Sequence, residues 1–318
     1  MDPAGAACES ARTGLGSVFC RAAAQSEREM RVGKVAAMSA FASGSFGELR
    51  DAHAAMKLGP YMRDLWDRRS YVWYEAVSEL RARQVTSVLG NLWHLLNPAL
   101  NIFIYYLIFG LLLKVDRGID NFILFLATGL FVFQLTQKTT TDGARSMIAN
   151  KGLLRAIKFP RAMLPITGAV TEMLSGISSF LVLIPIALLT GESPRWSWIL
   201  LVPLLAVQFV FNLGASFVAA RLTTHFVDVI QILPFVFRLI LYASGVIFSV
   251  DAYVQPGSSV RLLFTLNPIY CYVTVGRWCM LGGPLDAAIV LSGIGWAVLF
   301  FATGFLWFRQ AEERYARV

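Results

Sequence analysis

Residues 142–165 read DGARSMIANKGLLRAIKFPRAMLP, a basic and polar interval between two long apolar runs. The interval holds five of the chain's 28 lysines and arginines but a single acidic residue, Asp142. Basic residues beside membrane spans are retained on the cytoplasmic side, so this interval predicts how the chain is threaded through a membrane. It is also the longest loop expected on that side, which makes it the place where an external partner could bind.

The composition is that of a membrane protein. Of the 318 residues, 56% are hydrophobic and 15% are charged, which is far more apolar than a soluble domain of this size. The net charge of +8 comes from basic residues that lie beside apolar runs, where anionic lipid headgroups explain them better than nucleic acid does. We therefore expect a membrane, and no nucleic acid, as a partner.

Six apolar segments are each compatible with the ~20 residues that a helix needs to cross a bilayer. They cover residues 96–113, 122–140, 164–189, 198–220, 230–250 and 288–308. Lysine and arginine are more frequent in the loops that this threading leaves inside, which predicts a multi-pass protein of the cytoplasmic membrane with both termini cytoplasmic. We predict an all-α polytopic protein with a six-span domain over residues 96–318, interrupted by the loop 141–164.

Two segments precede the spans. Residues 1–58 are rich in Ala, Gly, Ser and Arg and lack an apolar run long enough for a signal peptide, so we expect a disordered cytosolic tail or a start codon placed too far upstream. Residues 59–95 have a helical pattern that predicts an amphipathic interface helix, with an ordinary packed surface helix as the alternative. The residues expected at the headgroup level are Trp66, Trp73, Arg81 and Arg83.

Residues 251–285 do not fit a simple span. The apolar run 262–281 is broken by Asn267-Pro268, and the part after the break is too short to cross a membrane. We predict a pair of re-entrant helices that enter from the outer face and are covered by protein or by a water-filled cavity. Such a hairpin would lie next to a pathway, and its candidate residues are Asn267, Pro268, Tyr270, Tyr272 and Arg277.

Two ionisable residues, Glu172 and Arg238, fall inside the predicted spans. Charges at such positions are functional candidates by default. Each lies seven or eight residues from the cytoplasmic end of its helix, so both are ~11 to 12 Å deep. We predict that they form a pair, which either gates a pathway or holds two helices together as a structural ion pair.

Aromatic residues make up 13% of the chain and are frequent in the spans. Rings on a pore wall would offer flat apolar faces to sugar C–H groups, whereas most aromatic side chains in spans contact lipid or pack between helices. The candidate channel aromatics are Phe103, Tyr105, Tyr106, Phe131, Phe133, Phe235 and Tyr242.

The sequence contains no GxxxxGK[ST], HExxH or GxSxG motif. The four cysteines and three histidines have no metal-ligand spacing, so no metal site and no catalytic residue is proposed. Cys271 and Cys279 are expected to be free thiols, because eight residues along one helix separate them by ~12 Å. The chain is therefore not expected to be an enzyme.

Three stretches together resemble the permease subunits of ABC-2 type polysaccharide exporters, the Wzm and TagG group. Residues 79–110, ELRARQVTSVLGNLWHLLNPALNIFIYYLIFG, are similar to that family's junction of interface helix and first span. Residues 149–167, ANKGLLRAIKFPRAMLPIT, are similar to its loop after span two, and residues 262–277, LLFTLNPIYCYVTVGR, to its gate region. The sequence departs from the common pattern at Gln84, where Tyr is usual, and at Ala156, where a basic residue is usual.

The resemblance implies a homodimer bound to two copies of a separate ATPase, which would carry ATP and Mg while this chain holds no cofactor. Lipid-linked polysaccharide of the O-antigen, galactan or teichoic-acid type would leave through a channel at the dimer axis, and the overall likeness is greatest to actinobacterial galactan exporters. The ATPase would push on a coupling segment in the loop after span two. Its residues are Met147, Asn150, Lys151, Leu153, Leu154, Arg155, Lys158 and Phe159.

Two alternatives stay open. The motifs are compatible with a related permease that moves a smaller lipid or a drug. A membrane-embedded enzyme acting on polyprenyl-linked sugars would need acidic residues grouped near a membrane face, and Glu172 and Asp228 are too isolated in the sequence to make such a site.

Overall fold

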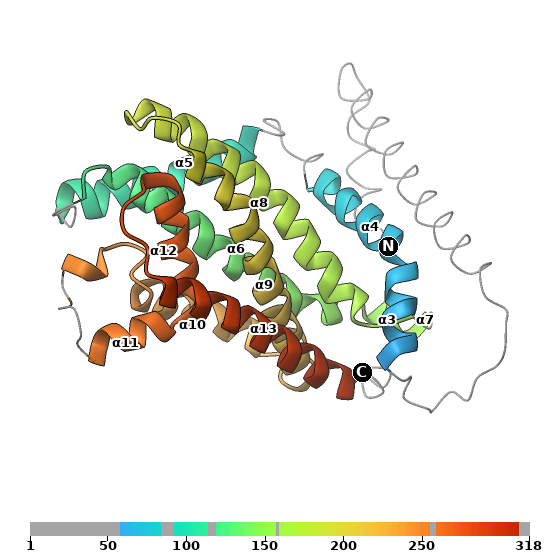
Figure 1. Ribbon diagram of the computed structural model, residues 1–318. Coiled ribbons are helices and arrows are strands. Elements are labelled where there is room, and N and C mark those ends of the chain that lie inside the picture. The colour runs from blue at the N-terminus through green and yellow to red at the C-terminus, as the bar shows by residue number, and fades with distance from the viewer. Residues whose placement is uncertain are drawn as a thin grey trace, which may run out of the picture. The chain divides into compact units, whose positions relative to one another are not determined.

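The computed structural model describes residues 58–83, 92–113, 119–156, 159–252, 254 and 259–311 (Figure 1). All of them lie in the compact unit that begins at Ala55. The predicted N-terminal tail and Lys158 lie outside the described residues, apart from Leu58. The described part is helical and contains no β-strand, in agreement with the all-α prediction.

The elements follow one another along the chain with short connections. They are α3 (Leu58–Asp67), α4 (Arg69–Ala82), α5 (Leu92–Tyr105), the π-helix η1 (Tyr106–Leu112), α6 (Phe122–Ala149), α7 (Lys151–Ala156), α8 (Met163–Leu189), the 3-10 helix η2 (Trp196–Leu200), α9 (Leu201–His225), α10 (Val229–Ala243), the 3-10 helix η3 (Val250–Ala252), α11 (Ser259–Leu266), α12 (Pro268–Leu281) and α13 (Ala287–Gln310).

Four helical segments are long and apolar enough to cross a membrane: Phe122–Ala149, Met163–Leu189, Trp196–His225 and Ala287–Gln310. They coincide with the second, third, fourth and sixth predicted spans. The first and fifth predicted spans correspond to two shorter apolar helices, Ala99–Leu112 and Val229–Ala243. A protein with six spans therefore stays a prediction, while four candidate spans are present in the described residues.

Helix α6 is the central element of the bundle. It packs against α8, α9, α12, α10 and α5, and its residues from Leu124 to Phe133 are all buried. Apolar side chains on every side of this half explain the burial, because a helix without a polar face is enclosed by its neighbours. Asn121 begins the helix by accepting a hydrogen bond from the Leu124 amide at 3.1 Å, and its own amide donates to Thr190 Oγ1 at the end of α8.

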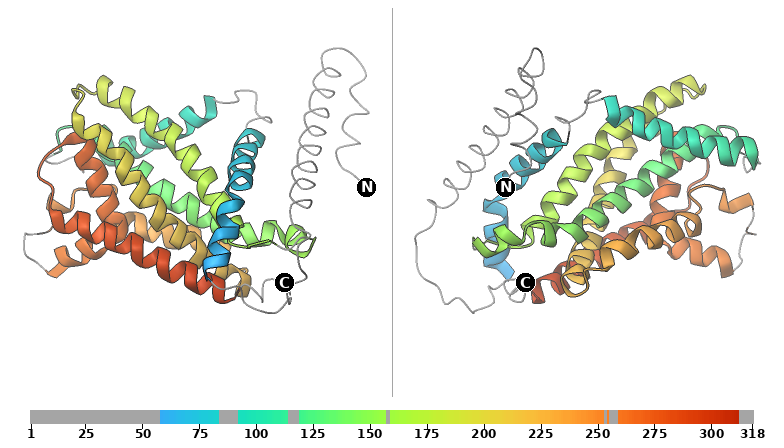
Figure 2. Two further views of the ribbon diagram at one scale, coloured as in Figure 1. Left: turned by 45° about the vertical axis from the view of Figure 1, so that its right-hand side comes forward. Right: turned by 180° about the vertical axis from the view of Figure 1, so that it is seen from behind.

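Small residues allow α9 to pack closely on two neighbours. The position of a Cβ on Gly143 of α6 would overlap Ser216 of α9. On the opposite neighbour, α13, a Cβ on Gly304 would meet the backbone of Gly214. Such close approach of backbones is typical of helix packing in membranes. Helices α6, α9 and α13 therefore form one closely packed block, which Figures 1 and 2 show side by side.

The helical break predicted at Asn267-Pro268 is confirmed. Helix α11 ends at Leu266, and Pro268 is the first residue of α12. The Asn267 side chain accepts from the Ile269 amide at 3.0 Å and donates to Ser244 Oγ at 2.9 Å, so it caps α12 and ties it to the end of α10. That the two helices re-enter a membrane from the outer face stays a prediction.

The N-terminal part corrects the prediction of one interface helix over residues 59–95. It consists of two helices, α3 and α4, that meet at Arg68, and Leu92 already belongs to α5. Helix α4 packs on α8 and buries Val72 and Ala76. Trp66 and Trp73 are instead 67% and 53% exposed, as a headgroup contact would require.

Candidate functional site

A cluster of charged residues joins three helices around Arg83, at the end of α4. The Arg83 guanidinium donates to Glu172 Oε1 of α8 at 2.5 Å, to Asp142 Oδ2 of α6 at 2.9 Å and to Glu79 Oε1 of α4 at 3.0 Å. Thr171 Oγ1 donates to the other oxygen of Glu79 at 3.3 Å. The cluster connects the helix predicted at the membrane interface to the first residue of the basic interval.

Arg83 supplies the positive charge that pairs with the carboxylates of this cluster. Burial by itself lowers the pKa of the Arg83 guanidinium, but the hydrogen bonds to Glu172, Glu79 and Asp142 outweigh burial and raise that pKa above its ordinary value. Arg83 therefore stays charged at every physiological pH. Glu172 is only 4% exposed, so its carboxylate depends on this one guanidinium for compensation.

The structure corrects the predicted pair of Glu172 and Arg238. Glu172 pairs with Arg83, while the Arg238 guanidinium lies 6.0 Å from the centroid of the Phe235 ring on its own helix. The reason is the packing of α4 on α8, which brings Arg83 to Glu172. The depth of two residues along their helices does not reveal such a contact.

The predicted coupling segment is a short helix at one end of the bundle. Helix α6 continues to Ala149, and the Asn150 amide then donates to the Ser146 carbonyl at 2.9 Å. After the turn at Asn150, residues Lys151–Ala156 form α7, which Figures 1 and 2 show beyond the end of α6. Residues 142–149 of the basic interval therefore belong to α6, and residues 151–156 form the separate short helix α7.

Apolar side chains of the coupling segment pack in a hydrophobic cluster. Met147 is buried, and Leu153, Leu154 and Phe159 pack partly buried against the same cluster. It also contains side chains of α3, α8, α9 and α13, namely Tyr61, Leu164, Phe217, Phe305 and Phe308. Lys151 is half-buried, while the side chain of Arg155 and all of Lys158 lie outside the described residues. The segment therefore packs against one hydrophobic cluster that also contains side chains of four other helices.

The predicted gate residues lie in α12, except Asn267, which caps it, and Arg277 is buried. Its guanidinium is buried and donates to the carbonyls of Phe125 (3.2 Å), Gly245 (2.9 Å) and Val246 (2.5 Å), and it lies 3.4 Å from the centroid of the Phe125 ring. Tyr272 is also buried and donates to the Gly293 carbonyl of α13 at 2.7 Å.

Tyr270 is buried too, with its ring centroid 5.5 Å from that of Phe264 on α11. Together with the Asn267 cap, these contacts hold α12 to α6, α11, α13 and the turn after α10.

The candidate channel aromatics divide into two groups. Phe131 and Phe133 are each 3% exposed and pack against Phe180 and Phe237, with ring centroids 6.0 and 6.1 Å apart, so their assignment to a channel wall is corrected to the core. The partly buried Tyr105 and Tyr106 pack against that core. The remaining members are on the surface of the described part: Phe103, Phe235 and Tyr242.

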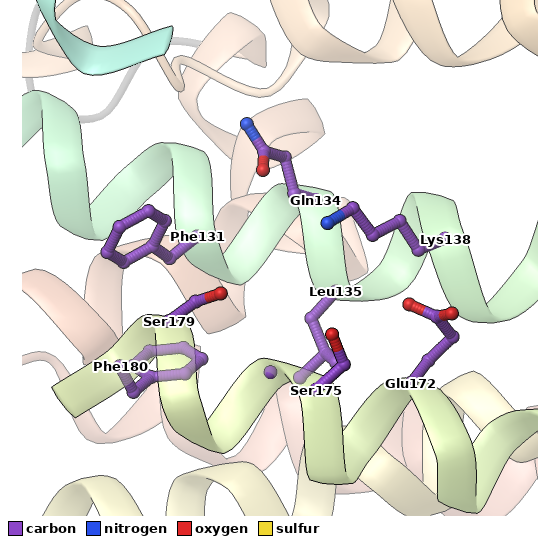
Figure 3. A pocket seen from close by; sticks show the side chains of 9 residues that line it. Phe131, Gln134, Leu135, Lys138, Glu172, Ser175, Ser179 and Phe180 are labelled. Carbon is purple, nitrogen blue, oxygen red and sulfur yellow. The ribbon is translucent and has the colours of Figure 1, made fainter. Parts of the chain in front are cut away.

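A cleft between α6 and α8 was missed by sequence reasoning. Figure 3 shows Gln134 and Lys138 of α6 opposite Glu172, Ser175 and Ser179 of α8. Leu135 and Gly176 form its floor, and Phe131 and Phe180 close one end. The signal that could have found it is Lys138, a charged residue inside the predicted second span.

No cluster suited to a metal ion occurs among the described residues, which include no group of three or more His, Cys, Asp or Glu side chains with that geometry. Cys271 and Cys279 are free and buried thiols, as expected. The candidate functional regions are the charged cluster around Arg83, the coupling segment, α12 with its contacts, and the α6–α8 cleft.

Comparison with known proteins gives these regions a context. No protein-family profile matches the chain. The chain is 28% identical over 241 residues to an O-antigen export system permease protein RfbA of Klebsiella pneumoniae, a match that covers 76% of this chain and 91% of the relative.

It is 27% identical over 213 residues to the protein of the same name from Myxococcus xanthus, covering 67% of this chain and 81% of the relative. It is also 22% identical over 237 residues to the polysialic acid transport protein KpsM of Escherichia coli, covering 74% and 91%. These similarities relate the chain to permease and transport proteins of polysaccharide export.

Proposed function

We propose that this chain is the permease subunit of an ATP-driven exporter that moves lipid-linked polysaccharide across the cytoplasmic membrane. The observation that carries the proposal is the similarity to O-antigen export permeases over 76% of the chain and 91% of the relative. The helical fold with four candidate spans supports it. The substrate that we favour, on overall likeness, is the galactan precursor of actinobacterial cell walls.

The proposed assembly is a homodimer with two copies of a separate ATPase. ATP and Mg would bind to the ATPase, since this sequence has no P-loop motif. The coupling segment supports a docking role, because α7 lies beyond the end of α6 and rests on side chains of α3, α8, α9 and α13. Closure of the ATPases would move this segment, and the segment would in turn move the helices whose side chains share its hydrophobic cluster.

A second route for the same movement is the charged cluster. Arg83 links α4 to Asp142 and Glu172 at distances of 2.5 to 2.9 Å. Asp142 lies two turns before the end of α6, so the interface helices and the coupling segment act on the same pair of spans. The gate would respond through α12, which Arg277 fastens to α6.

The proposal is tested by expressing the chain, together with a candidate ABC ATPase from its own genome, in a strain that lacks its own O-antigen permease and accumulates polymer inside. We expect the polymer to appear at the cell surface and the ATPase to co-purify with the chain. An ATPase variant without its P-loop lysine is the matched control and should leave the polymer inside. Surface polymer with this inactive ATPase, or a chain that purifies without an ATPase, would contradict the proposal.

A further inference from the structure

The cleft between α6 and α8 continues as a polar edge along α6. Between positions 134 and 145, every residue of α6 that is not buried is polar. These residues are Gln134, Gln137, Lys138, Thr141, Asp142 and Arg145. Their spacing of three or four residues places them on one side of the helix. The edge therefore belongs to a helix whose other sides are covered by protein.

This pattern is opposite to that of the surfaces expected to face lipid. On the outer side of α8 the exposed residues include Leu181, Ile184 and Leu188, and on α13 they include Leu291 and Val298. Of this edge, Gln134, Gln137 and Lys138 lie within the predicted second span, where a polar or charged side chain in contact with lipid is unfavourable. This part of the edge is therefore expected to face water.

Lys138 is the centre of this edge. It is exposed, and among the described residues it has no hydrogen-bond or ion-pair partner. A long side chain can bend its ammonium group toward the headgroups, but this explanation does not cover Gln134, one turn deeper, or Ser175 and Ser179 on the facing helix. The polar groups on both helices are explained together if the cleft is part of an aqueous path.

The chemistry of the cleft indicates which solute it contacts. Gln134 and Ser179 each offer a donor and an acceptor, and Lys138 offers donors, while the Glu172 carboxylate is paired with Arg83. Sugar hydroxyls need both kinds of partner. A phosphate group needs donors alone, and Lys138 is the one cationic side chain among the residues that line the cleft. The mixed set therefore suits a carbohydrate better than an anion.

We propose that the α6–α8 cleft and the polar edge of α6 line an aqueous path and hydrogen-bond the sugar hydroxyls of a passing polysaccharide, with Lys138 as the central contact. The carbohydrate assignment rests on the proposed export function, whereas the aqueous path stands on the arrangement of α6 and α8 alone.

Water access is tested on the full-length protein in inverted membrane vesicles with a charged, membrane-impermeant methanethiosulfonate. Cys8 and Cys20 are replaced by serine, while the buried Cys271 and Cys279 stay. Cysteine is introduced at Gln134, Lys138 or Ser175, and at Leu181 as the lipid-facing control. We expect the first three to react at least ~10 times faster than the control, because only the hydrated thiolate reacts. Rates equal to that of Leu181→Cys would overturn the path whether or not the chain exports a polymer.

The carbohydrate contact is tested by export of the host polymer in the complementation strain. Lys138→Gln keeps a hydrogen-bonding side chain, whereas Lys138→Leu does not, so we expect the first to retain most of the export and the second to lose it about tenfold, with Leu181→Ala as control. If Lys138→Gln failed like Lys138→Leu while Lys138→Arg worked, a positive charge would be required and the sugar assignment would be overturned. Normal export by Lys138→Leu would overturn it as well.

Discussion

At the scale of single residues, Arg83 determines how α4 is held on the bundle. One guanidinium serves three carboxylates from three helices, and the one that it binds at 2.5 Å, Glu172, is buried. Arginine suits this position because its planar fork presents several donors at fixed angles, while lysine would present a single ammonium. The free energy of unfolding that is lost with Arg83 therefore depends mainly on Glu172, whose carboxylate would stay buried without a partner.

We expect Arg83→Ala to lower the free energy of unfolding by ~3 to 5 kcal/mol, since it leaves Glu172 buried without a counter-charge. The double variant Arg83→Ala with Glu172→Gln should recover at least half of that loss. The measurement is the thermal unfolding of purified protein in detergent. Glu79→Ala is the control, because its side chain is 42% exposed and its loss should cost no more than about 1 kcal/mol. A wild-type transition for Arg83→Ala would show that the cluster does not stabilise the fold.

At the scale of elements, hydrophobic runs predicted the helices well but not their faces. Helices α6, α8, α9 and α13 lie where apolar length placed spans, and Asn267-Pro268 separates α11 from α12. The first half of α6 is apolar all round, so its periodicity could not tell that Phe131 and Phe133 are core residues.

The partners of charged residues were equally hidden. Arg83 and Glu172 are 89 positions apart, and only the packing of α4 on α8 brings them together. The Lys138 cleft likewise needs the α6–α8 contact to exist. A sequence pattern places such residues on helices, whereas their partners follow from tertiary contacts.

The crossing of α9 and α13 gives a test at this scale. We expect Gly304→Ala to lower the free energy of unfolding by about 1 to 3 kcal/mol, because the new methyl group would meet the Gly214 backbone, which has no side chain to move away. Gly295→Ala in the same helix is the matched control, since nothing lies within 4 Å of its Cβ position, and it should stabilise the helix by up to ~1 kcal/mol. Equal behaviour of the two variants in thermal unfolding would contradict close packing at this crossing.

At the scale of the whole molecule, the coupling segment and the gate are connected by one rigid element. Helix α6 begins near the contacts of Arg277 and ends at Ala149, just before α7. Because α6 also packs closely on α9, and α9 on α13, these three helices are expected to move together. Movement relative to this block is left to α5, α10 and the interface helices.

The docking role of the coupling segment predicts a separation of hydrolysis from export. We expect Arg155→Glu with Lys158→Glu to abolish export while the chain remains folded and the ATPase remains active, because reversed charges would oppose the docking surface. ATP hydrolysis, surface polymer and thermal unfolding are measured on the same complex. Arg155→Glu and Lys158→Glu are also measured singly, and Arg309→Glu, at the end of α13, is the single charge reversal outside the segment that controls for them. Unchanged coupling in the double variant would count against docking at this loop.

The enclosure of α6 from Leu124 to Phe133 has an electrical consequence. On the N-terminal side of Gln134, α6 has no polar edge. The stretch from Phe122 to Gln134 is ~18 Å long, which is more than half the thickness of the hydrocarbon core of a bilayer. A hydrated cleft along the second half would therefore end against a thick, low-dielectric wall, where an ion would lose its hydration without compensation. If the proposed path is hydrated, this apolar half of α6 is therefore expected to keep it from conducting ions across the membrane.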